Sequence, residues 1–427
     1  MTKAALLAAT SLSVALLASA GAWAQNAQEG PSNAKLLERI EQLEAELKAM
    51  KDLVGEHDEA VASSTEEAKK VARSTVKAAI PRLPDTVWHL AGYADAGVIV
   101  GDKTSPGSFN AGTFNPAFHF QYRDFILFEG EAEITINNEG ETDFELEYTQ
   151  LDILLHDNAT LVVGKYLSPI GQFGERLHPS WINRSVNAPA GFGHDGIQPG
   201  TDVGVQLRGG VPLGATTFTY ALAVGNGPRL GHEGNVMLEG YGGDDNKNKS
   251  IGGRLGFLPV PYFELGVSYL NASVDGDDMD GTVAATSGDF KLWGLDGAFT
   301  KGSWDVRFEY LNGKRDSLFS FDDEEGALAL LPQMKQVAWY AQAAYRLSGI
   351  TKNAILKNFE PVVRYGKYSI AGNEELEEEN AEKRFNIGLN YWLAPSIVAK
   401  AGIERRNFIV EDIPNDTRYL FQIAYGY

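Results

Sequence analysis

Apolar and polar residues alternate with a period of two from Trp88 to the C-terminus. The clearest run is the last one, in which Tyr419, Phe421, Ile423, Tyr425 and Tyr427 alternate with Arg418, Leu420, Gln422, Ala424 and Gly426. Similar runs occur at 263–269, 304–310 and 383–391. One face of each run is aromatic or aliphatic, and the other is mostly small, polar or charged. This pattern is typical of β-strands with one apolar face, which occur in soluble sandwiches and in membrane barrels.

The lengths of the connections distinguish these two folds. We predict sixteen strands, near residues 88–100, 116–122, 125–137, 142–155, 159–167, 201–211, 216–226, 250–258, 262–274, 289–300, 303–313, 335–347, 358–370, 383–393, 396–410 and 417–427. The connections that follow even-numbered strands are short, with one longer exception at 348–357. Most of the connections that follow odd-numbered strands are long. Transmembrane barrels alternate short periplasmic turns with long outside loops in this way, whereas a sandwich need not. We therefore predict an all-β, sixteen-stranded antiparallel transmembrane β-barrel over residues 88–427, in which closure pairs every backbone polar group within lipid.

The apolar period changes to 3.5 near the N-terminus. Leu36, Ile40, Leu43, Leu47, Met50 and Val54 follow a 4-3-4-3-4 spacing. This is the seam of an α-helical coiled coil, so we predict a coiled-coil segment over residues 25–80 that joins copies of the chain. The alternatives are a helix packed on its own domain and, for the coiled coil, a dimer or a trimer. Pro81 and Pro84 end the helix and begin a linker over 81–87.

Residues 1–24 have the pattern of a secretory signal peptide. Lys3 precedes an apolar stretch over 4–20, and Ala22-Trp23-Ala24 forms an A-x-A cleavage site. The apolar stretch is shorter than the roughly 20 residues of a membrane-spanning helix. We therefore predict cleavage before Gln25, a barrel in the bacterial outer membrane and a coiled coil in the periplasm.

Composition narrows the possible chemistry. The 427 residues include 37 Lys and Arg, 57 Asp and Glu and no Cys, which gives a formal net charge of −20. Without Cys there is no disulfide scaffold, thiolate metal site or Cys nucleophile. The acidity argues against a nucleic-acid partner. Neither HExxH nor GxSxG occurs, so we predict no enzyme, cofactor or metal site.

The residues opposite the aromatic face should line the lumen. On the third and fourth strands these are Glu129, Glu131, Glu133, Glu145 and Glu147, and on the later strands Arg346, Arg364, Arg384, Lys400 and Arg406. We predict an acidic wall that faces a basic wall across an aqueous pore. The electric field between the two walls would favour polar solutes. The alternative is local pairing in a closed lumen. A sixteen-stranded interior is too wide for side chains alone to fill.

Three outside loops carry further candidates. The longest, 168–200, could fold into the pore and narrow it or pack over a neighbouring subunit, and its candidate constriction residues are Glu175, Arg176, Arg184 and Asp195. The acidic runs 322–325 and 374–382 should be solvated faces. As a hypothesis, they bind divalent cations that link them to lipopolysaccharide, or they concentrate cations at the mouth of the channel.

The motifs around the longest loop resemble those of Gram-negative outer-membrane porins. They are Gly164-Lys165-Tyr166-Leu167-Ser168-Pro169-Ile170-Gly171-Gln172-Phe173, Leu177-His178-Pro179-Ser180-Trp181-Ile182-Asn183 and Gly191-Phe192-Gly193-His194-Asp195-Gly196. The resemblance is broadest to the superfamily of phosphate-selective porins O and P, many of which carry an N-terminal coiled coil. It implies a trimeric channel for passive diffusion of small polar solutes or ions. The last strand resembles the signal read by the barrel-assembly machinery, with Tyr427 where Phe is usual. Phosphate selectivity does not carry over, because no matching Lys cluster occurs.

Two alternatives to a general diffusion channel remain. One is a substrate-specific outer-membrane channel. The other is an envelope tether, since a helical segment of about 45 residues would span about 65 Å at 1.5 Å per residue.

Overall fold

The structure is a computed structural model, and it describes residues 85–427 except 102–106, 111, 138, 194–195, 232–233, 278–284, 323–325 and 411–412. The predicted signal peptide, the predicted coiled coil and most of the linker lie outside the described residues. So does Asp195.

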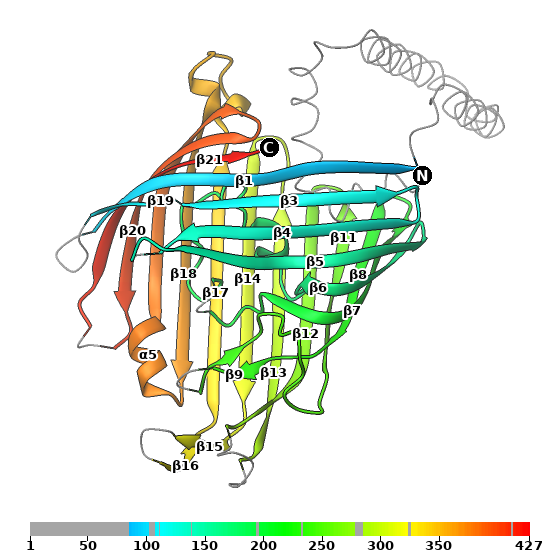
Figure 1. The fold of residues 1–427 in the computed structure, drawn as a ribbon. Helices are drawn as coiled ribbons and strands as arrows, with labels where there is room; N and C mark the ends of the chain where they lie inside the picture. Colours follow the sequence, from blue (N-terminus) through cyan, green and yellow to red (C-terminus); the bar gives the residue numbers. More distant parts are fainter. Residues whose placement is uncertain are drawn as a thin grey trace. The chain divides into compact units, whose positions relative to one another are not determined.

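The described chain folds into a closed antiparallel β-barrel (Figure 1). Its wall consists of β1 (Thr86–Val100), β3 (Thr113–Tyr122), β4 (Ile126–Ile136), β5 (Thr142–His156), β6 (Ala159–Leu167), β7 (Thr201–Leu213), β8 (Thr216–Gly225), β11 (Ser250–Val260), β12 (Phe263–Asp275), β13 (Ser287–Phe299), β14 (Trp304–Arg315), β17 (Met334–Tyr345), β18 (Phe359–Ala371), β19 (Glu382–Ala394), β20 (Ile397–Phe408) and β21 (Asp416–Gly426). The sheet contains 17 strands, because the short β2 (Ser108–Asn110) pairs beside β1. The prediction of a sixteen-stranded barrel is confirmed.

The first and last strands close the barrel. β1 pairs with β21 in a register that runs from Tyr93 opposite Gly426 to Val100 opposite Tyr419. The seam ends where Gly92 N–H donates to the Tyr427 carbonyl at 3.1 Å and Tyr427 N–H donates to the Gly92 carbonyl at 2.9 Å. Closure leaves no strand edge exposed, as a lipid environment requires.

The outer face of the barrel is apolar, as β21 illustrates. Tyr419, Phe421, Ile423 and Tyr425 are 45% to 59% exposed, whereas Leu420 and Ala424 between them are buried. Most strands of the wall expose large apolar side chains in the same way, and water would disfavour so much exposed apolar surface, whereas lipid would not. The predicted division into an outer aromatic face and an inner face is therefore confirmed for this strand.

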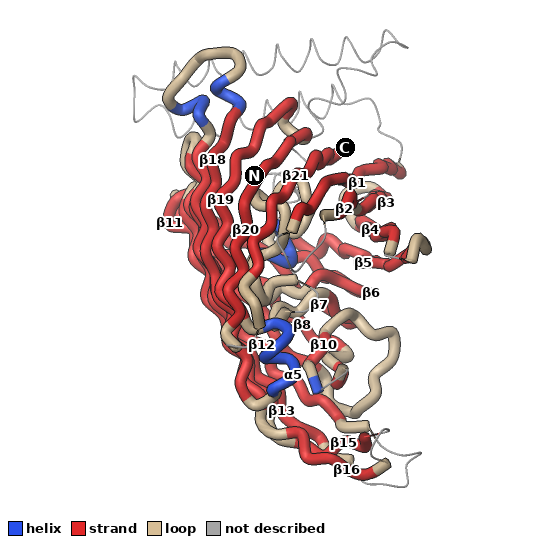
Figure 2. The backbone as a smooth tube through the Cα atoms, turned by 90° about the vertical axis from the view of Figure 1, so that its left-hand side faces the viewer, coloured by secondary structure: helices blue, strands red, loops and turns tan. Residues whose placement is uncertain are grey.

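The connections have the predicted parity, and the long ones contain elements that the alternation did not predict. These are the pairs β9 (Arg229–Leu230) with β10 (Val236–Met237) and β15 (Leu318–Asp322) with β16 (Ala327–Leu331), and the helix α5 (Glu374–Asn380). Figure 2 shows α5 and the β15–β16 pair at the same end of the barrel. The longer exception after β17 contains two short 3₁₀ helices, Leu347–Gly349 and Leu356–Asn358, at the opposite end. Among the described residues no helix is long and apolar enough to cross a membrane.

The acidic run 374–382 is only partly the solvated face that we predict. Asn373 caps α5 by accepting the Leu376 N–H at 3.0 Å, and acidic residues of the first turn suit the positive end of the helix. Glu382, however, belongs to β19 and is only 1% exposed. The prediction is wrong for this residue, because strand β19 starts one residue earlier than the alternation suggests and turns Glu382 into the barrel.

Candidate functional site

The longest connection, 168–200, lies inside the barrel. Its two ends meet at the wall, where Ser168 N–H donates to the Gly200 carbonyl at 2.8 Å. Between these ends the loop contacts the inner faces of β12, β14, β18 and β20. Of the two alternatives for this loop, the structure therefore has the one in which it enters the lumen.

A buried carboxylate on β14 holds the first part of the loop. Glu309 is 1% exposed, and its two oxygens accept the backbone N–H groups of Gln172 and Phe173, both at 3.1 Å. The side-chain amide of Gln198 donates to the same carboxylate at 3.2 Å, from the far end of the loop. One carboxyl group thus binds both limbs of the loop through three hydrogen bonds.

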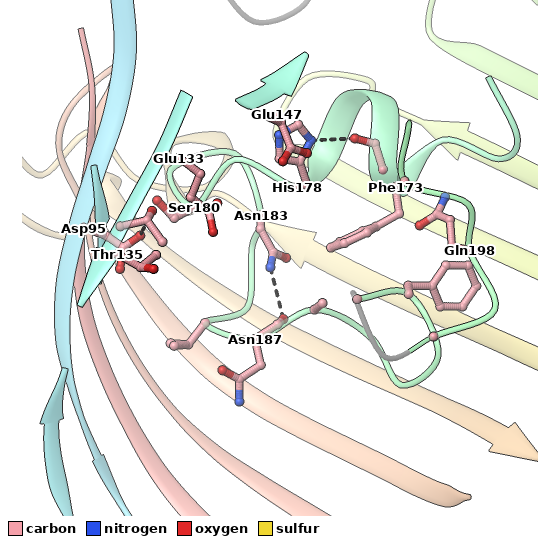
Figure 3. Close-up of a pocket in the computed structure, with 18 of the residues that line it drawn as sticks. Asp95, Glu133, Thr135, Glu147, Phe173, His178, Ser180, Asn183, Asn187 and Gln198 are labelled. Atoms are coloured by element: carbon pink, nitrogen blue, oxygen red, sulfur yellow. Dashed lines mark hydrogen bonds between the residues drawn. The ribbon is translucent and has the colours of Figure 1, made fainter. Parts of the chain in front are cut away.

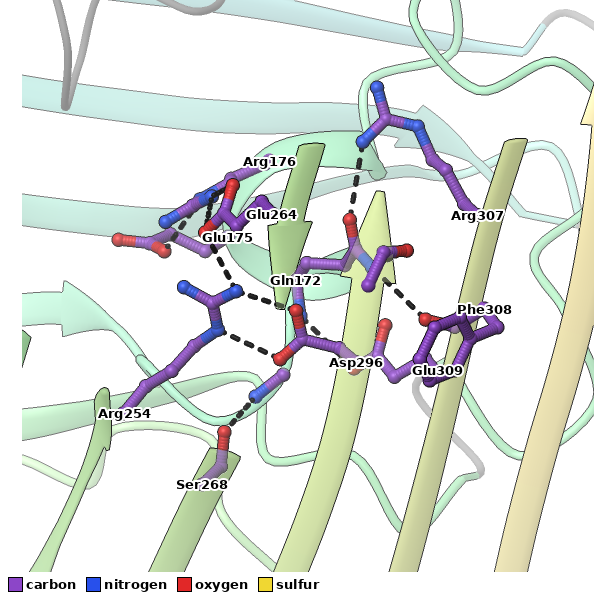
Figure 4. Close-up of polar contacts among 12 residues, drawn as sticks. Gln172, Glu175, Arg176, Arg254, Glu264, Ser268, Asp296, Arg307, Phe308 and Glu309 are labelled. Carbon is purple, nitrogen blue, oxygen red and sulfur yellow. Dashed lines mark hydrogen bonds and ion pairs between the residues drawn. The ribbon is translucent and has the colours of Figure 1, made fainter. Parts of the chain in front are cut away.

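The side chain of Gln172 adds a second attachment at this point (Figure 4). Its Nε2 donates to the carbonyls of Gly297 and Phe308 at 3.1 Å, and its Oε1 accepts from Arg307 at 3.2 Å. Gly171 precedes it with a φ of +74°, and a Cβ there would collide with the Glu309 carboxylate. Glycine is therefore required both for the backbone conformation and for the close approach.

Apolar packing fixes the middle of the loop against one wall. The buried cluster consists of Ile170, Phe173, Leu177, Ala190, Phe192 and Ile197 from the loop, Leu238, Leu376, and Leu270, Phe290, Leu292, Leu311, Met334, Ala338, Tyr340, Tyr368 and Ile370 from the wall. Phe192 meets Tyr340 edge-on with a centroid distance of 5.0 Å. The loop is therefore held against this part of the wall by a packed apolar core.

A short π-helix, Phe173–Leu177, carries two of the predicted constriction residues. Arg176 donates to both oxygens of Glu264 at 3.0 Å and pairs with Glu175 at 3.3 Å. Arg254, which the sequence analysis did not select, forms ion pairs with Glu264 at 2.8 Å and with Asp296 at 2.5 Å (Figure 4). These charges pair with one another, so they neutralise much of their own field.

The predicted basic residues Lys400 and Arg364 bind the second part of the loop. Lys400 is 4% exposed and donates to the carbonyls of Ser180 and Ser185, the latter at 3.2 Å. Arg364 is 3% exposed and donates to the Asn183 side chain at 2.5 Å and to the Asn187 carbonyl at 2.8 Å. The partners are neutral dipoles of the loop, and so both cations lie behind the loop.

Arg384 and Arg406, two other predicted cations of this wall, pair with a carboxylate. Glu382 binds both Arg384 and Arg406, the latter at 2.5 Å, and Arg384 also donates to the Ala188 carbonyl at 2.9 Å. Glu360 and Glu404, on the same wall, are buried as well. Period two on β18 to β20 brings acidic and basic residues to the same face, so the predicted basic wall also carries carboxylates.

Two further candidate cations gather at a buried Trp. The guanidinium of Arg346 lies 4.3 Å from the ring centroid of Trp392, and that of Arg184 lies 5.1 Å from it. Arg184 also pairs with Asp305 at 3.4 Å and with Glu360 at 3.6 Å. Arg184 thus fastens the loop, while Arg346 stacks where β17 ends.

The acidic residues of β4 and β5 face the lumen, but they differ in their partners. Glu129 is 3.8 Å from Arg208, which also pairs with Asp152. Glu131 accepts hydrogen bonds from neutral groups, namely Asn115 at 3.4 Å and the hydroxyls of Tyr93 and Tyr148.

The remaining three acids lie further along these strands. Glu133 accepts from Asn115 at 3.2 Å, and Glu145 is half exposed and 4.0 Å from Lys165. Glu147 is the extra residue of a β-bulge, because Glu131 pairs with Tyr148 and Ala132 pairs with Leu146. The Glu147 side chain nevertheless lines the lumen.

A cavity of about 590 Å³ separates this acidic wall from the loop (Figure 3). Asp95, Glu133, Glu147 and Glu239 supply carboxylates to it, and His178 and Asn183 line it from the loop. No Lys or Arg occurs among its described lining residues. No group of three potential ligand side chains suited to a metal ion occurs in the described part of the chain. The open space beside the loop is therefore acidic.

Sequence analysis missed several residues that organise this site, above all Glu309, Gln172 and Asp95. A signal for Glu309 exists, because it lies on the polar face of the alternating run 304–310. Nothing comparable marks Gln172, whose partners are main-chain carbonyls of distant strands.

Three solved structures resemble this fold. They are the outer membrane channel DcaP of Acinetobacter baumannii (TM-score 0.53, 11% identity, 80% of this chain and 97% of that chain), an anion-selective porin from Comamonas acidovorans (0.52, 12%, 80% and 100%) and a loop-deletion mutant of OmpT, an outer membrane protein of Vibrio cholerae (0.51, 10%, 81% and 100%). The likeness concerns the fold, which is that of outer-membrane porins and channels. No protein-family model matches the sequence, and no curated protein matches it.

Proposed function

We propose that this protein is an outer-membrane channel through which small polar solutes or ions diffuse passively. The observation that carries the proposal is the loop 168–200, which lies inside a closed barrel and leaves an acidic cavity beside it. An inserted loop narrows a barrel of this size without sealing it, and it sets which charges face the passage. Solved structures of similar fold, which include a channel and a porin, support the same role.

The charges around the passage favour cations. Lys400 and Arg364 are bound to loop carbonyls, and Arg384 and Arg406 are paired with Glu382. The described cavity lining, by contrast, supplies only carboxylates. A fixed negative charge in an aqueous passage raises the local concentration of cations and lowers that of anions.

The remaining parts of the proposal come from the sequence. They are export by the signal peptide at 1–24, trimerisation through the coiled coil at 25–80 in the periplasm, and insertion by the barrel-assembly machinery next to lipopolysaccharide. They also include membership of the broad phosphate-selective porin superfamily without its phosphate selectivity.

Planar-bilayer recording under a KCl gradient tests the proposal. We expect stepwise conductance, in groups of three for a trimer, and a reversal potential with the sign set by K⁺. A variant in which a short Gly-Ser linker replaces residues 173–197 should conduct more, because the base of the loop is retained and its inner part is removed. A correctly folded barrel that carries no current in either form would contradict the proposal and favour the tether.

A further inference from the structure

The cavity beside the loop has two chemically different sides. Figure 3 shows Asp95, Glu133 and Thr135 on one side and Phe173 on the other, with Glu147 and His178 between them. We propose that this cavity is a binding site for organic cations that also have an apolar part. An example is a molecule in which a short chain joins an ammonium group to an aromatic ring. This inference rests on the proposed channel function and names the class of solute that the channel selects.

The carboxylates supply the charge recognition. Asp95 accepts from the Thr113 hydroxyl at 3.4 Å, and Glu133 accepts from the Asn115 amide at 3.2 Å. Both donors are neutral, and the described cavity lining includes no Lys or Arg. A carboxylate held by a single neutral donor has further acceptor sites, which suit an ammonium group with several N–H donors.

The opposite side of the cavity is apolar and already packed. Phe173, Phe192, Ile197, Leu238 and Phe290 line the cavity and also belong to the buried core that fixes the loop. Phe173 and Phe192 meet edge-on with a centroid distance of 6.3 Å. Because the wall of the barrel holds these side chains, the apolar surface exists before any solute arrives. A hydrated inorganic ion would use only the carboxylates and would make no use of the apolar part of the lining.

The size of the cavity fits the same class of solute. A volume of about 590 Å³ lies within the range of about 300 to 1,000 Å³ found for small-molecule sites.

Block of single-channel KCl current tests the inference, with 2-phenylethylammonium as the probe. We expect brief, concentration-dependent block by this cation. Ethylammonium, which lacks the ring, should need about tenfold higher concentration, and phenylacetate, which has the ring and the opposite charge, should not block. The variant Glu133→Gln with Glu147→Gln should weaken block by the probe about tenfold or more.

A matched control removes two charges elsewhere. Glu375→Gln with Glu378→Gln changes exposed positions on α5 and should leave block unchanged. Heat-modifiable gel mobility establishes that each variant is folded, and titration calorimetry with the detergent-solubilised protein measures binding directly.

The outcomes separate the two proposals. KCl current without block by the probe, equal block by phenylacetate, or full block in the Glu133 and Glu147 variant would overturn the organic-cation site and leave the channel standing. A folded barrel without KCl current would overturn the channel. In that case, calorimetric binding that depends on Glu133 and Glu147 would still support the cavity as a site, and its absence would overturn the site as well.

Discussion

Replacement of Lys400 by Met should release the second part of the loop and widen the channel. The ammonium donates to the carbonyls of Ser180 and Ser185 and to the Gln422 side chain at 2.8 Å. Met has a similar length and apolar stem, so it removes the donor and the charge with little change in volume.

The structure allows the size of this effect to be worked out. Hydrogen bonds to a charged group contribute about 1.5–3 kcal/mol each, and a buried carbonyl left without a donor costs about 1–3 kcal/mol. Desolvation of the buried ammonium opposes the first contribution. Lumenal water can reach carbonyls that move, so we take the lower limit of about 1 kcal/mol for each of the two loop carbonyls. About 2 kcal/mol raises the population of the detached loop roughly 30-fold.

Single-channel recording measures this population as openings of higher conductance and as increased current noise. Lys291→Met is the matched control, since Lys291 is exposed on the barrel and pairs with Asp289 at 2.9 Å. Lys400→Arg should restore part of the wild-type behaviour because it keeps a charged donor. A folded Lys400→Met barrel with wild-type conductance and noise would refute the idea that this residue holds the loop.

Three further predictions concern the charges and the loop. Combined Glu129→Gln, Glu131→Gln and Glu133→Gln should shift the reversal potential towards anions, and an unchanged potential would count against the assignment of this wall to the passage. Gly171→Ala should raise conductance and lower thermal stability by more than Gly214→Ala does. Both glycines have positive φ, but only a Cβ at position 171 would collide with the Glu309 carboxylate. Equal effects of the two variants in melting and conductance assays would argue against attachment of the loop at Glu309. The preference for cations should decrease when the KCl concentration rises from 0.1 M to 1 M, because the Debye length decreases from about 10 Å to about 3 Å. If reversal potentials gave the same permeability ratio at both concentrations, the charges that select cations would not be screened by the solution in the passage.

The strands could be predicted because their signal is local. Each strand of the wall has one face on the outside of the barrel and one on the inside, so the alternation in a run such as 419–427 reports its structure without reference to other strands. The alternation of short and long connections then orders the strands around the barrel. Both signals depend on neighbours in the sequence, and they yield the correct number and order of wall strands.

The course of the loop could not be predicted, because its attachments join distant parts of the chain. Lys400 and Ser180 are 220 residues apart, and Arg364 and Asn183 are 181 apart. Sequence analysis selected Lys400 and Arg364 as lumenal cations but assigned them to the passage, since nothing near them in the chain shows that loop carbonyls accept their hydrogen bonds.

Small departures from the alternation also change the site. The bulge between Glu131 and Ala132 lets Tyr148, Gln150 and Asp152 share the inner face with the glutamates of β4. A strict period of two from Glu145 and Glu147 would turn these three residues towards lipid.

The loop 168–200 also has a mechanical consequence for the barrel. It is bound at Glu309 on β14, at Arg364 on β18 and at Lys400 on β20, and its ends are joined to β6 and β7 on the other side. A hollow cylinder of paired strands is easily flattened, because its hydrogen bonds resist stretching of the wall more than bending. A chain segment fixed to opposite arcs of the cylinder acts as a brace, so the cross-section should keep its shape when the membrane is compressed or thinned.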